Sequence, residues 1–136
     1  MRSQLTGQGN GEEMSGKGII LFGHGARNPE YLEPFQRISA ALLALEPLAR
    51  VEIGFLELMQ PSFESAVDRL VAGGIRQIVV VPIFFAPGRH VLKDLPPLAA
   101  NAMERHAGLA IEIASAVGQS PAVIAAMARF ALDSAA

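Results

Sequence analysis

Residues 76–85, RQIVVVPIFF, form the most continuous apolar run of the chain and decide its fold. A strand without a polar face is typical of the interior of a parallel sheet, where both faces are covered. Pro82 has no amide hydrogen, so we expect it at the end of this strand, where no ladder donor is missed. Residues 18–23, GIILFG, have the same character, and we expect both strands at the centre of one sheet.

Two further runs alternate apolar and polar residues, which is typical of strands with one exposed face. They cover residues 50–56, RVEIGFL, and residues 109–117, LAIEIASAV. We therefore expect four strands, with residues 50–56 nearer an edge of the sheet than the two apolar runs.

Helical patterns separate and follow these strands. The first begins after Asn28, with its regular part expected from about Glu33, because Pro34 cannot lie deep in a helix. The later ones occupy residues 60–74, 93–108 and 120–136, the second entered through prolines and the last capped by Ser120. With right-handed crossovers, this alternation predicts an α/β fold: a four-stranded parallel sheet in the order 2-1-3-4 with helices on both faces.

Length and composition limit the possible classes of protein. The 136 residues fit a single domain, which we place at 17–136 after a flexible, polar and glycine-rich tail at 1–16. The absence of cysteine excludes disulfides, thiolate metal sites and cysteine nucleophiles. The net charge of −2 gives no general attraction to nucleic acid, and no segment has the apolar length of a membrane span. Without an apolar leader we expect a soluble, cytoplasmic protein, whose natural start is either Met1 or Met14.

Three chemistry-bearing residues follow different strands of the predicted sheet. His24 lies between two glycines after the first strand, Glu57 follows the second, and His90 comes after the third. Because parallel strands end at the same edge, where such sheets bind ligands, we expect these side chains to converge there. Two imidazoles and a carboxylate suit a divalent first-row metal ion. The alternatives are a turn residue whose ring caps the following helix for His24, and a solvated strand-end carboxylate for Glu57.

Basic residues lie beside the same edge, and common nucleotide motifs are missing from the sequence. Arg27, Arg89 and Lys93 are either ordinary solvated charges or contacts for a substrate rich in carboxylates. GHGARN lacks the third glycine of a dinucleotide-binding loop, and there is no GxxxxGK[ST] motif. The sequence therefore gives no case for ATP as a cofactor.

Several segments together resemble a known family. LFGHGARNP at 21–29, FLELMQPSFESAVDRLVAGG at 55–74, IVVVPIFFAPGRHVLKDLP at 78–96 and AVGQSP at 116–121 are similar to the short, single-domain sirohydrochlorin chelatases of the CbiX type. These are ATP-independent tetrapyrrole chelatases related to ferrochelatase. The resemblance implies a flavodoxin-like half-unit and a homodimer in which two short chains form one cleft.

The resemblance also implies roles for individual residues. The metal-binding histidines of the family fall on His24 and His90, and its acidic residue falls on Glu57, so these three would hold the metal and accept protons. The substrate would be sirohydrochlorin or a close relative, with Co²⁺ as the metal and Fe²⁺ or Ni²⁺ as possibilities, and no other cofactor. Glycines at the strand ends would let the flat ring approach the backbone, and basic residues would meet its carboxylate arms. The glycines are Gly23, Gly25 and Gly88; the basic residues are Arg27, Arg89 and Lys93.

Two other functions remain open. A non-catalytic metal or tetrapyrrole carrier could be built on the same fold, and it would bind without accelerating insertion. A phosphoryl-transfer enzyme of the histidine-phosphatase kind also has a histidine after the first strand, within an RHG motif. Here Gly23 stands where that motif has its phosphate-binding arginine.

Overall fold

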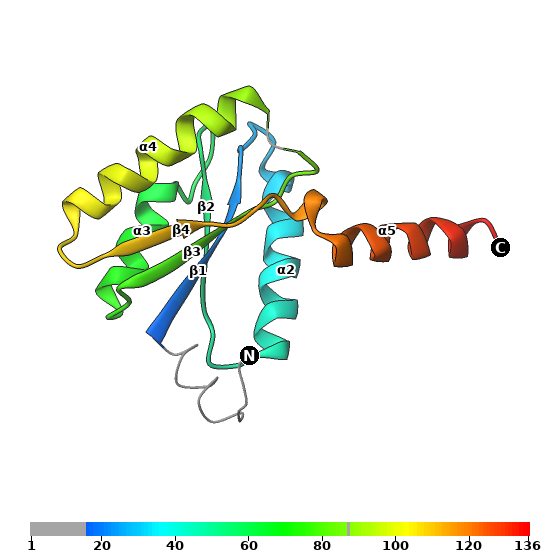
Figure 1. Cartoon of the computed structure of the whole chain (residues 1–136), viewed down its shortest axis with the longest axis horizontal. Helices are drawn as coiled ribbons and strands as arrows, with labels where there is room; N and C mark the ends of the chain where they lie inside the picture. The colour runs from blue at the N-terminus through cyan, green and yellow to red at the C-terminus, as the bar shows by residue number, and fades with distance from the viewer. Residues whose placement is uncertain (1–15, 87) are drawn as a thin grey trace.

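The computed structural model describes residues 16–86 and 88–136, and it contains a four-stranded parallel sheet (Figure 1). The strands are β1 (Lys17–Gly23), β2 (Arg50–Phe55), β3 (Gln77–Pro82) and β4 (Ala110–Ile113). Their order is β2-β1-β3-β4, with Ile20 paired to Glu52 on one side and to Val80 on the other. The predicted fold class and strand order 2-1-3-4 are therefore confirmed.

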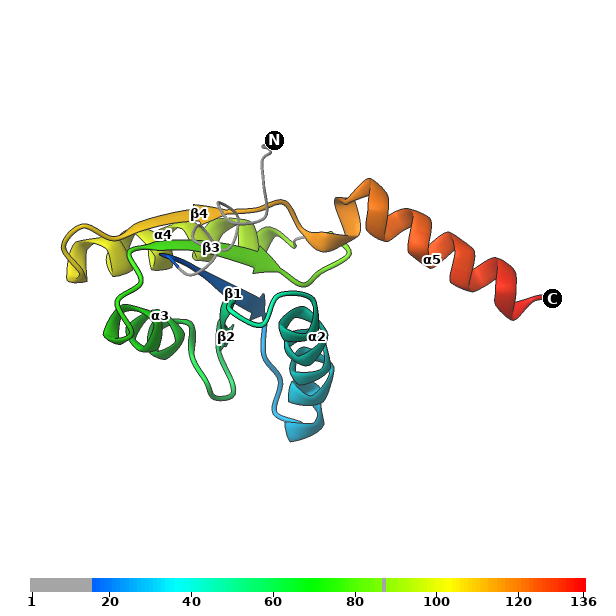
Figure 2. The same ribbon diagram turned by 90° about the horizontal axis from the view of Figure 1, so that it is seen from below.

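Helices lie on both faces of the sheet. They are α2 (Leu32–Leu45), α3 (Phe63–Ala72), α4 (Arg89–Arg105) and α5 (Pro121–Ser134), with the short 3-10 turns η1 (Pro29–Tyr31) and η2 (Val117–Gln119). Figure 2 shows α2 and α3 on opposite sides of β2. The helix α5 projects away from the rest of the molecule in both views.

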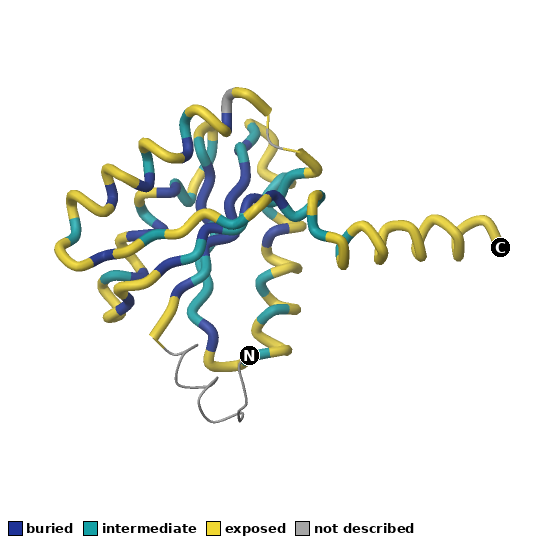
Figure 3. Tube along the Cα trace, viewed as in Figure 1, coloured by how far each residue is buried: buried dark blue, intermediate teal, exposed yellow. Residues whose placement is uncertain are grey.

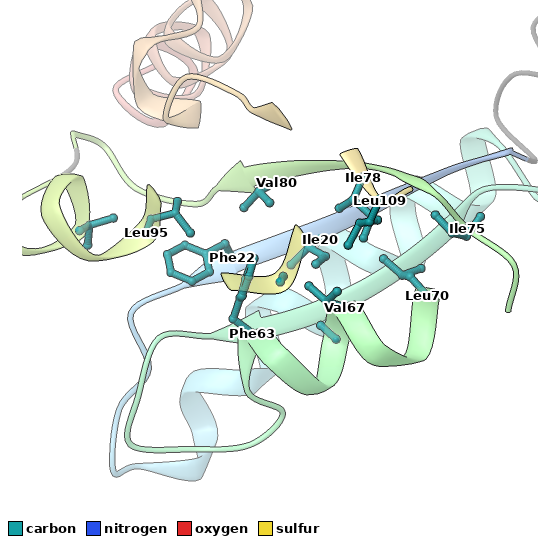
Figure 4. Close-up of a cluster of buried hydrophobic side chains, with 13 residues drawn as sticks. Ile20, Phe22, Phe63, Val67, Leu70, Ile75, Ile78, Val80, Leu95 and Leu109 are labelled. Atoms are coloured by element: carbon teal, nitrogen blue, oxygen red, sulfur yellow. The ribbon is translucent and has the colours of Figure 1, made fainter. Parts of the chain in front are cut away.

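The larger core lies between the sheet and the helices α3 and α4 (Figure 4). Ile20 and Phe22 of β1 and Val80 of β3 are completely buried in it. Phe63 begins α3 and meets the ring of Phe22 edge-on, with 5.9 Å between the ring centroids. Because alternate residues of a strand point to opposite faces, the neighbours of these residues, such as Leu21, pack on the other side.

A smaller core lies under α2. Phe35 of α2, Leu21 of β1 and Phe55 of β2 are its buried members, and the two phenylalanine rings lie 5.0 Å apart between centroids. Gly23 ends β1 directly beneath Phe35, where a Cβ atom would overlap the phenylalanine ring. The end of β1 is thus fixed by close packing against α2.

The helix boundaries follow the capping residues in two of three cases. Asn28 accepts a hydrogen bond from the Glu30 amide at 2.9 Å, which starts the turn η1 before α2. Ser62 caps α3 in the same way, by accepting from the Ser65 amide at 3.1 Å. Ser120 precedes α5 as predicted, but its side chain makes no capping hydrogen bond.

Three predicted boundaries differ from the structure. The strand expected at 76–85 is shorter and ends at Pro82, the residue expected at its end; after it the Ile83 amide still donates to the Phe22 carbonyl at 2.8 Å, and the Phe84 carbonyl accepts from the Gly118 amide at 2.8 Å. The strand expected at 109–117 is limited to β4, since the chain leaves the sheet to form η2. The helix expected at 93–108 begins at Arg89 and holds Pro96 within it.

The early start of α4 has a packing reason. Val91 and Leu95 are buried against the large core, so the turn before the prolines is held to the sheet. Pro96 and Pro97 are exposed, so the carbonyls that lose their amide donors can be solvated.

Two further expectations concern the chain as a whole. Most of the predicted tail, residues 1–15, lies outside the described residues. Across the described ranges, every helix is too short or too polar to cross a lipid bilayer.

Candidate functional site

Two predicted site residues meet at the carboxyl ends of β1 and β2. The Nε2 atom of His24 lies 3.1 Å from the Oε2 atom of Glu57. Their side chains are 37% and 48% exposed, so the pair lies at the surface of the sheet edge and is open to a ligand. The expected convergence of these two residues is therefore observed, although 33 positions of sequence, from 24 to 57, separate them.

Backbone hydrogen bonds hold the loops that carry this pair. The amides of Leu56 and Glu57 donate to the carbonyls of Gly23 and His24 at 3.0 and 3.1 Å. These bonds extend the β1–β2 pairing by two residues beyond the end of β2 and by one beyond the end of β1. The backbone therefore places His24 and Glu57 side by side at the sheet edge.

Two features of the residues after Glu57 hold the same loop in place. The Ala26 amide donates to the Sδ atom of Met59 at 3.3 Å. Leu58 has a φ of 72°, a left-handed conformation that is rare for a residue with a branched side chain. Such strain persists only where surrounding contacts hold it, and here it turns the chain directly after Glu57.

The glycine after His24 makes the close approach of the two loops possible. Gly25 has a φ of 99°, and a Cβ atom on it would collide with the Glu57 carbonyl oxygen. Packing inside the protein therefore accounts for Gly25, as it does for Gly23 beneath Phe35. The expected role of both glycines in admitting a flat ring stays a prediction.

The hydrogen bonds of His24 define which ring nitrogen can bind a cation. Its Nδ1 atom lies 3.2 Å from the Gly25 carbonyl oxygen, which can only accept, so the tautomer with the hydrogen on Nδ1 satisfies this contact. The Nε2 atom of a neutral ring is then an acceptor that faces the Glu57 carboxylate, which is another acceptor. Two acceptors at this distance need a cation between them, either a proton on Nε2 or a metal ion. Either cation would satisfy the pair, and binding of a metal ion here stays a prediction.

The remaining predicted residues lie around the start of α4 and after β1. Gly88 is the N-cap residue of α4, Arg89 begins the helix, and Lys93 follows one turn later, all of them exposed. Arg27 is exposed in the loop after His24. His90 is the second residue of α4, and its side chain lies outside the described part of the structure.

The described side chains alone do not complete a metal centre. Among them, no group of three or more histidine, cysteine, aspartate or glutamate residues is placed to hold an ion. His24 and Glu57 supply two donors, and the contribution of His90 stays a prediction.

Sequence reasoning missed an apolar hollow at the same edge of the sheet. Its volume is about 660 Å³, and it lies between the segment after β3 and the start of α5. Tyr31, Phe84 and Met127 are among its lining residues. Gly118 also lines it, and there is no room for a Cβ atom on this glycine against the Phe85 backbone. The segment AVGQSP contains this glycine, but its need for close approach depends on a contact with a distant loop.

A second histidine–carboxylate pair lies at the opposite, amino-terminal end of the sheet. The Nε2 atom of His106, at the end of α4, lies 2.8 Å from the Oδ1 atom of Asp68 on α3, and Arg105 lies 3.0 Å from the same oxygen. The hydrogen bond from His106, helped by Arg105, lowers the pKa of Asp68 below its usual value. This pair joins α3 to the end of α4, so a structural contact between two helices accounts for it.

Comparisons with known proteins identify relatives of this chain. A family model for CbiX matches residues 18–133. The sirohydrochlorin cobaltochelatase of Sulfurisphaera tokodaii is 35% identical over 101 residues, which make up 74% of this chain and 79% of that protein. The sirohydrochlorin cobaltochelatase of Methanopyrus kandleri is 35% identical over 80 residues, 59% of this chain and 56% of that protein. The match thus spans little more than half the length of the Methanopyrus relative.

Solved structures share the fold. A CbiX protein of cobalamin biosynthesis from Marinobacter aquaeolei VT8 superposes with a TM-score of 0.76 at 30% identity, covering 87% of this chain and 96% of that one. The sirohydrochlorin chelatase SirB from Bacillus subtilis subspecies spizizenii, in complex with cobalt, has a TM-score of 0.73 at 26% identity. The superposition covers 86% of this chain and 50% of SirB. From the family match over most of its length, the chain belongs to the CbiX family.

Proposed function

We propose that this protein inserts a divalent metal ion, Co²⁺ in the first place, into sirohydrochlorin or a closely related tetrapyrrole without ATP. Membership of the CbiX family and the names of its cobaltochelatase relatives support this function. The observation that carries it in this chain is the contact between His24 and Glu57 at the edge of the sheet. The metal ion is a substrate, so the site must bind it and also release it.

The distance within the pair suits two ligands of one ion. Ligand atoms about 2.1 Å from a common metal ion, with bonds near a right angle, lie about 3 Å apart. The separation of 3.1 Å between Nε2 of His24 and Oε2 of Glu57 is close to that value. His90 is expected to supply a further nitrogen donor. So few protein ligands hold an ion loosely, which favours its transfer to a macrocycle that offers four nitrogens.

Metal insertion also requires the loss of two pyrrole protons. The Glu57 carboxylate is half exposed at the site and is an acceptor for one of them. His24 or His90 is expected to accept the other once the metal has left. Because a histidine must be neutral to bind a metal ion, insertion is expected to slow in acid.

The surroundings of the pair supply contacts for a flat, polyanionic ring. Arg27, Arg89 and Lys93 are expected to meet its carboxylate arms, which bidentate guanidinium groups recognise well. The apolar hollow beside Tyr31 is expected to take part of the ring face. The protein would act in the cytoplasm as a homodimer that encloses one ring in a shared cleft.

An insertion assay tests this function. Purified protein is mixed with Co²⁺ and sirohydrochlorin, and the absorbance change is followed against a protein-free control, then repeated with Fe²⁺ and Ni²⁺. We expect acceleration without ATP, and a large loss of rate in His24→Ala, His90→Ala and Glu57→Gln. His106→Ala is the matched control, because it removes a histidine that also contacts a carboxylate, but at the other end of the sheet.

Two results would contradict the proposal. Full insertion activity in both His24→Ala and His90→Ala would remove these residues from the reaction. Binding of metal and ring with an insertion rate equal to the protein-free control would identify a carrier.

A further inference from the structure

Leu58 is an exposed apolar residue beside the candidate metal pair. It follows Glu57 directly and is 50% exposed. Its neighbours Leu56 and Met59 each pack against a core, whereas Leu58 belongs to neither core of the described residues. Figure 3 shows how the chain passes from the buried end of β2 into this exposed loop. Packing inside the protein therefore does not account for a leucine at this position.

The backbone at Leu58 makes a leucine unfavourable. Its φ of 72° lies in the left-handed region, which glycine adopts without cost and asparagine tolerates. Leucine bears the cost of this conformation and, being half exposed, regains little of it through burial. Backbone strain of this kind clusters at active sites and ligand clamps. We therefore expect the leucine side chain to contact a ligand.

A second exposed apolar residue lies on the other side of His24. The strand β1, which His24 follows, lies between β2 and β3. Phe85 comes three residues after the end of β3 and is 77% exposed, whereas Ile83 and Phe84 before it pack against the cores. Since neighbouring strands lie about 4.8 Å apart, β2 and β3 are about 10 Å apart. The His24 loop thus leaves the sheet between two loops that each present one exposed apolar residue.

This arrangement limits the chemistry of the ligand. His24 and Glu57 are 37% and 48% exposed at the same edge. A ligand that covers this edge must offer apolar surface to Leu58 and Phe85, and donor atoms for a cation near its middle. A flat macrocycle with nitrogens at its centre meets both conditions, whereas a small carboxylate or phosphate would leave both apolar residues in water.

We propose that Leu58, together with Phe85, contacts the face of the tetrapyrrole and holds it over the metal pair. The inference rests on the proposed function, because it takes the tetrapyrrole as the ligand. It gives the strained residue a task that binding of the metal ion alone does not need. Loss of the Leu58 side chain is therefore expected to weaken binding of the ring and to leave binding of the ion unchanged.

Three measurements on Leu58→Gly test this role. Metal-free sirohydrochlorin is titrated into the protein and followed by its fluorescence, Co²⁺ is titrated separately, and urea unfolding gives the midpoint. We expect about 3–10-fold weaker ring binding, from the loss of part of a leucine's apolar contact area. The affinity for Co²⁺ should not change, and the urea midpoint should rise because glycine relieves the strain. Leu58→Asn should weaken ring binding in the same way, and Leu58→Met, which keeps an apolar side chain, should bind the ring like wild type.

Controls and refuting results separate this role from a structural one. Leu48→Ala removes another exposed leucine, 61% exposed, just before the amino-terminal end of β2, and should bind the ring like wild type. Phe85→Ala should bind it more weakly. Wild-type ring affinity in Leu58→Gly and Leu58→Asn would overturn the inference. A lower urea midpoint or weaker Co²⁺ binding in Leu58→Gly would show that the leucine only holds the loop, and would overturn it as well.

Metal insertion is measured separately on the same proteins. Ring binding that depends on Leu58 without any insertion would keep this inference and refute the proposed activity. Insertion and ring binding at wild-type levels in Leu58→Gly would do the reverse.

Discussion

Replacement of Gly25 by alanine tests how the loop geometry holds the candidate site. Gly25 has a φ of 99°, and its Cα faces the Glu57 carbonyl so closely that a Cβ atom would overlap the oxygen. The substituted chain must push the Glu57 peptide away. Glu57 also donates its amide hydrogen to the His24 carbonyl at 3.1 Å, so its displacement reaches both members of the pair.

The magnitude can be worked out from two contributions. A left-handed conformation costs a residue with a Cβ atom about 1–2 kcal/mol. Weakening the hydrogen bond between Glu57 and His24 adds about 1 kcal/mol. We expect Gly25→Ala to lower the free energy of unfolding by about 2–3 kcal/mol and to reduce metal insertion strongly.

Gly74→Ala is the matched control for the conformational contribution. Gly74 has a φ of 94°, but no heavy atom lies within 4 Å of the place that a Cβ atom would take, so only the conformational cost of about 1–2 kcal/mol applies. Urea unfolding followed by circular dichroism measures both variants, and the insertion assay follows. Equal losses of stability, or undiminished insertion in Gly25→Ala, would refute the role assigned to the contact with Glu57.

Three further predictions concern acid stability, backbone strain and substrate charge. Because the pKa of Asp68 is lowered in the folded state, its contribution is present above its ordinary value of 3.8 and is lost as pH falls through the lower folded value. Asp68→Asn should therefore cost about 0.5 kcal/mol at neutral pH, and urea titrations should show this difference shrinking in acid. Leu58→Gly should raise the unfolding free energy by about 0.5–1 kcal/mol by removing the strain at φ 72°; a loss of stability would contradict that interpretation. Arg89→Ala and Lys93→Ala should raise KM for the carboxylate-rich ring without changing urea stability, and an unchanged KM would make them ordinary surface charges.

The centre of the fold and the His24–Glu57 pair could be predicted for the same reason. An apolar run such as residues 76–85 has one stable place, between two helical layers, and a parallel arrangement then brings successive strand ends to one edge. His24 and Glu57 each follow a strand directly, so their meeting depends only on strand order. Two backbone hydrogen bonds between the loops after β1 and β2 then hold the two residues next to each other.

The fine structure of the edge could not be predicted, because it depends on contacts between distant loops. A glycine at 25 is consistent with any sharp turn until the Glu57 carbonyl is placed against it. The contact of Met59 with the Ala26 amide and that of Gly118 with Phe85 have no local pattern. The start of α4 was also predicted too late. Proline favours the first turn of a helix, but the burial of Leu95 outweighs this preference, so the helix begins at Arg89 and contains Pro96.

The position of α5 shows a different limit of sequence patterns. The spacing of Ile124, Met127 and Phe130 predicts a helix with one apolar side, and the sequence is the same whether that side covers its own sheet or a neighbouring molecule. In this structure the turn at Gly118 lies against Phe85, and α5 extends outward from the sheet after it. A larger side chain at Gly118 would collide with the Phe85 backbone and disturb the hollow and the start of α5 together, because one close contact shapes both.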